Sequence, residues 1–144
     1  MEFKDFDKKI QDDVRKIVDE TLLHVQQALQ KDKCVMPQLK IEKEDGKNEV
    51  IEVVALDNDF DADEVFETSL QTLKETQFAY ARLVFDTVIL SANGGIAKAV
   101  KTFVFIKGGA MITFVTPYVI KGLFTKKVFI GDTILDGITE NIFE

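Results

Sequence analysis

Four polar side chains in the apolar second half of the sequence are the residues best suited to hold a ligand. Tyr80, Arg82 and Asp86 recur at even spacing within an expected strand at 79–90, so they project from one face of it. Tyr118 belongs to a later strand of the same sheet. These groups either line a ligand pocket or form cross-strand pairs. Because no general acid and base come together, we favour cross-strand pairs and keep the four as candidate ligand-binding residues.

Arg82 and Asp86 cannot pair with each other. Four residues along a strand separate two side chains by about 13 Å. We therefore expect their partners on neighbouring strands, where Lys98, Lys101 or an acidic residue would lie across the ladder.

An acidic segment in the middle of the chain has some features of a calcium loop. Its alternating acids are Asp57, Asp59, Asp61 and Asp63. However, Ala62 replaces the glycine of the sharp turn, and Thr68 stands where the bidentate glutamate belongs. We interpret the segment as a solvated loop that leads into a helix, because Asp61 and Glu64 have the spacing of a capping box.

One histidine and one cysteine complete the set of reactive side chains. His24 shares the seven-residue spacing of an apolar stripe, and the sequence around Cys34 has no signature of a cysteine hydrolase. We expect a structural histidine and an inert thiol. The sequence therefore predicts no catalytic residue, no metal site and no cofactor.

Length and composition limit the class of protein. The 144 residues suit one α+β domain over 1–144, and the net charge of −7 argues against nucleic acid as a partner. No apolar run reaches about 18 residues, so we expect no membrane partner. The start of the sequence has no signal-peptide pattern, so the expected location is cytoplasmic.

The negative charge is unevenly distributed. Residues 1–78 carry 11 bases and 20 acids, a net charge of −9, whereas residues 79–144 carry 7 bases and 5 acids, a net charge of +2. The acids either keep a helical surface soluble or form a surface for a basic protein partner.

The first half of the chain predicts two helices around a hairpin. From Phe3 to Lys31, apolar residues recur in steps of three and four, which indicates one long amphipathic helix. Apolar and polar residues then alternate on both sides of Asp45-Gly46, which predicts a β-hairpin. A second amphipathic helix follows the acidic segment 57–64.

The second half predicts a four-stranded antiparallel meander with strands at 79–90, 98–107, 110–119 and 123–130. Pro117 predicts that the third strand ends or bulges there. The tail from Gly131 to Glu144 fits a short strand or a docked turn of helix. The resulting fold class is α+β, with both helices most simply on one face of the sheet.

The meander strands are apolar on both faces. Strand 98–107 places Val104 and Ile106 on one side and Phe103 and Phe105 on the other. Such strands are normally buried on both faces, and helices on one face would leave the other bare. A curled sheet, the tail or another chain must then cover it. We expect a protein partner or self-association through this apolar face, as a homo-oligomer.

Two functions of different classes fit these observations. The first is a non-enzymatic protein-interaction or regulatory domain of the adaptor, inhibitor or immunity type, which the missing catalytic constellation favours. The second is a small-molecule-binding or enzymatic domain that uses polar residues of the sheet. A flat acidic face on the first helix would favour the first function. A concave pocket lined by Tyr80, Arg82 and Tyr118 would favour the second.

Overall fold

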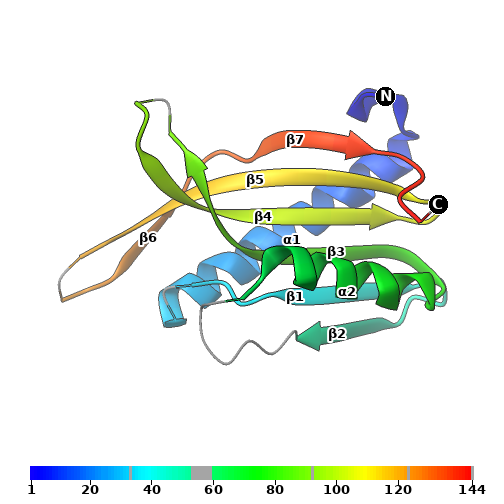
Figure 1. Ribbon diagram of the computed structural model, residues 1–144, viewed down its shortest axis with the longest axis horizontal. Coiled ribbons are helices and arrows are strands. Elements are labelled where there is room, and N and C mark those ends of the chain that lie inside the picture. The colour runs from blue at the N-terminus through cyan, green and yellow to red at the C-terminus, as the bar shows by residue number, and fades with distance from the viewer. Residues whose placement is uncertain (33, 53–59, 92, 123, 144) are drawn as a thin grey trace.

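A computed structural model describes residues 1–32, 34–52, 60–91, 93–122 and 124–143 of the chain. It shows a mixed α+β fold in which a curled antiparallel sheet lies between two helices (Figure 1). The fold class expected from the sequence is confirmed at this level. Within the described ranges, no helix is long and apolar enough to cross a membrane.

The elements follow in the order η1 (Phe3–Asp5), α1 (Lys8–Asp32), β1 (Gln38–Lys43), β2 (Asn48–Glu52), α2 (Ala62–Lys74), β3 (Phe78–Leu90), β4 (Ile96–Ile106), β5 (Ala110–Lys121), β6 (Lys127–Ile130) and β7 (Ile134–Thr139). The long helix begins at Lys8 and not at Phe3, because Phe6 has an extended backbone and separates a 3₁₀ turn from α1. The predicted hairpin turn is confirmed: Gly46 has a φ of +86°, a conformation that glycine adopts without strain.

The sheet is wider than the predicted meander. Its strand order is β2-β1-β3-β4-β5-β6, and β7 also pairs with β5. The hairpin extends the sheet on one side, because β1 pairs with β3 and places Lys40 opposite Arg82. The described part therefore forms a seven-stranded sheet and not a four-stranded one. The tail adds a strand and not a helical turn.

Pro117 does not end β5, which continues to Lys121. The neighbouring chain bulges instead, since residues 131–133 lie opposite only Thr116 and Pro117. The Gly131 nitrogen donates to the Pro117 oxygen at 2.8 Å, so the backbone of Pro117 faces this edge. Because proline offers no N–H there, the ladder is interrupted between β6 and β7.

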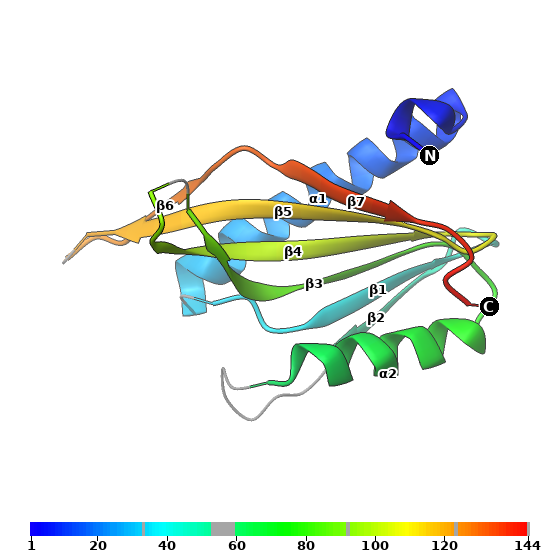
Figure 2. The same cartoon turned by 45° about the horizontal axis from the view of Figure 1, so that its top comes forward.

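The two helices cover opposite faces of the sheet, so the expectation that both lie on one face is wrong (Figure 2). Leu83 and Phe105 belong to the core under α2. Their chain neighbours Val84 and Val104 belong to the cores under α1. Strands that are apolar on both faces need a cover on each, and a helix on each side supplies it.

Helix α1 is not an acidic surface. It carries five bases and five acids, so the negative excess of residues 1–78 lies elsewhere. Two of its acids pair with bases one turn away: Lys8 contacts Asp12 at 3.1 Å and Lys9 contacts Asp13 at 3.0 Å. These exposed pairs neutralise the helix without adding much stability.

Helix α2 begins with the cap that the sequence predicts. The Asp61 carboxylate accepts hydrogen bonds from the backbone nitrogens of Asp63 at 3.0 Å and Glu64 at 3.3 Å. These bonds satisfy two donors that have no partner inside the helix.

We predict that Asp61→Ala lowers the free energy of unfolding by about 1 kcal/mol, measured by urea denaturation, because the capping acceptor is lost. Asp61→Asn keeps an acceptor and should retain most of the stability. Glu67→Ala, an exposed substitution within α2, should change stability by less than about 0.5 kcal/mol. Equal losses for Asp61→Ala and Glu67→Ala would show that the cap contributes nothing.

Candidate functional site

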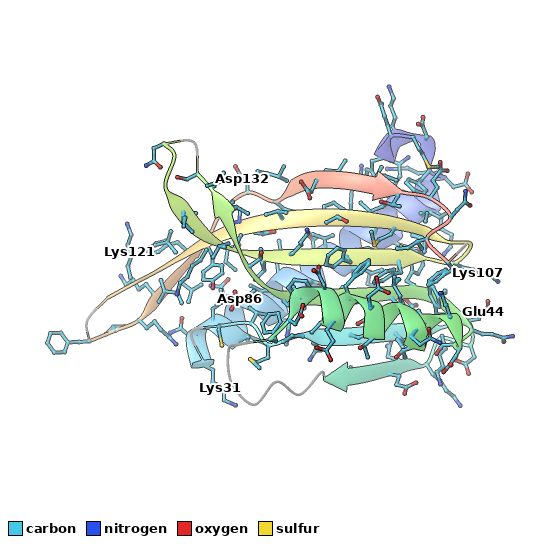
Figure 3. All side chains as sticks on the ribbon, in the orientation of Figure 1. Lys31, Glu44, Asp86, Lys107, Lys121 and Asp132 are labelled. Carbon is cyan, nitrogen blue, oxygen red and sulfur yellow. The ribbon has the colours of Figure 1, made fainter. Side chains whose placement is uncertain are left out.

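The four candidate residues all project from the α1-facing side of the sheet, but they form two separate groups. Tyr80 and Arg82 line a groove beside β1, where α1 leaves the sheet open. Asp86, further along β3, meets Tyr118 of β5 beneath the C-terminal half of α1. Figure 3 shows Asp86 well separated from Glu44, a residue that lines the groove.

Asp86 and Tyr118 form a closed hydrogen-bond network. The Asp86 carboxylate accepts from the Tyr118 hydroxyl at 2.7 Å and from the Val35 backbone nitrogen at 2.6 Å. The Asp86 backbone nitrogen donates in turn to the Val35 oxygen at 3.1 Å. No ion pair with Lys98 or Lys101 forms among the described residues. The network fastens the segment after α1 to the sheet, which is a structural role.

The protonation behaviour of this pair agrees with that role. Burial raises the pKa of Asp86 above its usual 3.8, although the bonds from Tyr118 and Val35 and the charge of Lys98 oppose the rise. Burial and the hydrogen bond to Asp86 raise the pKa of Tyr118. The hydroxyl therefore stays protonated at neutral pH and acts as a donor, not as a base.

Tyr80 joins β3 to α1 through its hydroxyl, which donates to the Asp13 carboxylate at 2.8 Å. This bond, helped by Lys9, lowers the pKa of Asp13, and burial with the bond to Asp13 raises that of Tyr80. Neither group titrates near neutral pH. The pair holds the helix against the sheet and is not suited to transfer protons.

Arg82 is the unusual member of the set, because it is only 6% exposed. Its Nη1 donates to the Gln38 side-chain oxygen at 3.1 Å and to the Gln38 backbone oxygen at 3.3 Å. No carboxylate of the described residues lies within 4.0 Å of its guanidinium. Burial lowers the pKa of Arg82 to about 10, opposed by the charge of Glu20. The side chain thus remains a cation at neutral pH.

A groove of about 580 Å³ opens between α1 and the β1–β2 end of the sheet. Its floor consists of the side chains of three strands that face α1: Gln38, Lys40, Glu42, Asn48, Val50, Tyr80 and Arg82. One wall comes from the first five turns of α1: Lys9, Asp13, Lys16, Ile17, Glu20, Thr21 and His24. The groove exists because α1 packs mainly on β4 and β6 and leaves β1 and β2 uncovered.

Sequence reasoning missed most of the groove. Gln38, Lys40 and Glu20 were not predicted to bind a ligand, because nothing local distinguishes them from surface residues. One signal was present in β1, where Gln38 and Lys40 alternate with the buried Leu39 and Ile41. That alternation predicts a strand with one polar face, but not the helix that stands over part of it.

The groove can bind through charge and hydrogen bonds. Cations and acids both line it, and the acids are Asp13, Glu20, Glu42 and Glu44. Among the described residues, no three His, Cys, Asp or Glu side chains are placed to hold a metal ion. Asp57 and Asp59 of the alternating acids lie outside the described residues.

Comparison with known proteins gives no match for this chain. No protein-family model matches the sequence. Curated proteins and solved structures also give no match. The function must therefore be inferred from the side chains of the groove.

We predict that Asp86→Asn gains stability relative to the native chain as pH rises above about 4. An aspartate whose pKa is raised by folding stabilises the native state most below its unfolded pKa of 3.8 and loses that contribution as pH rises through its folded pKa. Asparagine does not titrate. Urea denaturation of both chains from about pH 3.5 to 7 measures the difference in their free energies of unfolding. The contributions of the other carboxylates are the same in both chains and cancel in this difference. A constant difference, or one of opposite slope, would contradict the prediction.

Proposed function

We propose that this chain is a ligand-binding domain whose site is the groove between α1 and the β1–β2 end of the sheet. The observation that carries the proposal is a cavity of about 580 Å³ whose floor is polar and reaches a buried arginine. Small-molecule sites usually have volumes of about 300–1,000 Å³ and a few converging polar groups.

The walls of the groove are fixed before any ligand arrives. Its floor belongs to three strands that are hydrogen-bonded to one another. The α1 wall is anchored by the Tyr80–Asp13 bond and by Val14, which is fully buried in the core under α1. A preformed site loses little conformational entropy on binding, which favours recognition of a small ligand.

Binding fits the groove better than catalysis does. Folding moves the pKa values of Tyr80 and Asp13 away from neutrality, in opposite directions. The flat acidic face that would have favoured protein binding through α1 is weakened, because Asp12 and Asp13 pair with lysines of the same helix and the helix carries as many bases as acids. The polar residues of the sheet therefore support the small-molecule alternative.

Blocking the groove tests this function. Val50 lines it on β2 and is 53% exposed, so Val50→Trp fills the groove with a side chain that strands accept. Val88→Trp is the matched control, because Val88 is 63% exposed on β3 and does not line the groove. Thermal-shift screening of neutral, cationic and anionic compounds supplies the ligands. We expect these ligands to bind Val50→Trp at least about tenfold more weakly than the native chain, and to bind Val88→Trp with unchanged affinity.

The affinities are measured by calorimetry, and both variants should unfold within about 0.5 kcal/mol of the native chain. Compounds that bind Val50→Trp as tightly as the native chain would place the site elsewhere. Failure of every compound class to bind saturably would reject the proposed function.

A second function, self-association, is supported by the β5–β6 hairpin, which projects beyond the sheet (Figure 1). Phe124 at its turn is fully exposed, and Val119 and Phe129 are half exposed. Residues 119–131 hold three lysines and no acid, so the rest of the chain carries a net charge of −10. Figure 3 shows one of these lysines, Lys121, on the hairpin. The net negative charge of the rest of a second copy would attract such a basic, apolar hairpin.

We predict that the native chain has the light-scattering mass of a dimer or larger assembly, and that Phe124→Ser combined with Phe129→Ser reduces it to the mass of one chain. The substitutions remove apolar area at the contact and leave the core intact. Val88→Ser, on another exposed strand position, should not change the mass. A native chain that is already monomeric at working concentration would exclude self-association.

A further inference from the structure

We infer that the ligand of this groove is an anion, and that its carboxylate or phosphate group binds the free edge of the Arg82 guanidinium. The inference rests on the proposed function and adds the chemical class of the ligand. Three features of the groove support it: an unused edge of the guanidinium, a missing counter-ion and a second cation beside the first.

The unused edge follows from the hydrogen bonds of Arg82. Nη1 is the only guanidinium nitrogen that donates to Gln38, and Nε and Nη2 make no hydrogen bond to the described residues. No fully buried side-chain nitrogen or oxygen in the described part lacks a partner, so these two nitrogens keep some exposed surface, and the groove is the cavity that Arg82 lines. Nε and Nη2 present two parallel N–H groups, which match the two oxygens of a carboxylate or phosphate.

The missing counter-ion is the second feature. Glu20 is the acid whose charge acts on Arg82, yet its carboxylate is not within ion-pair distance. Instead it lies 4.0 Å from the Lys40 Nζ, with 54% of its side chain exposed. A buried arginine without a contacting acid is unfavourable unless another group supplies the negative charge.

The second cation is Lys40, which lies directly opposite Arg82 in the β1–β3 ladder. Side chains at such positions have Cβ atoms about 5 Å apart on the same face, and like charges there repel. An anion between the two would turn this repulsion into two attractions. The site therefore fits a small organic acid or a phosphate ester whose charged group lies between Arg82 and Lys40.

Glu20 then acts as a built-in competitor for the two cations. Its carboxylate lies near the position that the anion would take, on an exposed and adjustable side chain. An incoming oxyanion must displace it or lie beside it, at an electrostatic cost. Removing the charge of Glu20 should therefore strengthen anion binding, an effect opposite to that of removing Arg82 or Lys40.

The test is a titration of the full chain with inorganic phosphate and, separately, with acetate, followed by NMR at constant ionic strength with chloride as the balancing anion. The Arg82 Nε–H resonance reports binding at the proposed edge. We expect saturable shifts, with at least about tenfold weaker binding for Arg82→Gln and severalfold weaker binding for Lys40→Gln. Glu20→Gln should bind severalfold more tightly. Lys8→Gln, on the exposed face of α1 outside the groove lining, should bind as the native chain does.

Unchanged affinity in Arg82→Gln, or in both Glu20→Gln and Lys40→Gln, would overturn the inference. If Arg82→Gln does not fold, the opposite shifts expected for Lys40→Gln and Glu20→Gln decide the question by themselves. Binding of phosphate alone or acetate alone assigns the oxyanion class. Neutral compounds that bind in a Val50-dependent way while both oxyanions fail would reject this inference and leave the proposed function standing. Failure of all compounds rejects both.

Discussion

The width of the sheet determines most other features of this protein. The central strands are apolar on both faces, so each face must be covered. A helix is about 10 Å across and strands are about 4.8 Å apart, so one helix covers only two or three strands of a sheet this wide. The outer strands must then carry polar side chains on the uncovered face or leave apolar ones exposed. Strand β1 carries polar side chains on the face toward α1, whereas β6 and β7 leave apolar side chains exposed.

Arg82 and Asp86 show how the edge of the area covered by α1 affects a polar residue. Both lie on the same face of β3, four residues apart. Asp86 lies under α1, where its carboxylate accepts hydrogen bonds from Tyr118 and Val35. A buried polar group that is satisfied within the protein in this way has a structural role. Arg82 lies where the cover of α1 ends, deep enough to be buried and close enough to the groove to keep two nitrogens unused. The two residues look alike in the sequence and differ in their distance from the edge of the helix.

Local patterns predicted the features that depend on local physics. The Asp45-Gly46 turn, the Asp61 cap and the amphipathic stripes of α1 and α2 were predicted, and even spacing placed Tyr80, Arg82 and Asp86 on one face. The side on which each helix packs was not predictable, because an apolar stripe shows that a helix is buried but not against which face. Strand β7 was also ambiguous, since it joins the sheet through backbone bonds along β5 and keeps Ile134 and Leu135 exposed.

The partners of Arg82 were unpredictable for a different reason. The sequence indicated that Arg82 would have a neighbour across the ladder, but β1 is about forty residues away and its register with β3 depends on the whole fold. That register sets Lys40 opposite Arg82, a pairing that weakens an isolated sheet. Apolar burial of Leu39 and Ile41 on the other face of β1 fixes the register, because a slip by one residue would expose both. Packing under α2 therefore fixes the register that places Lys40 beside Arg82 on the opposite face. In this way the core on one side of the sheet determines which charges meet in the groove on the other side.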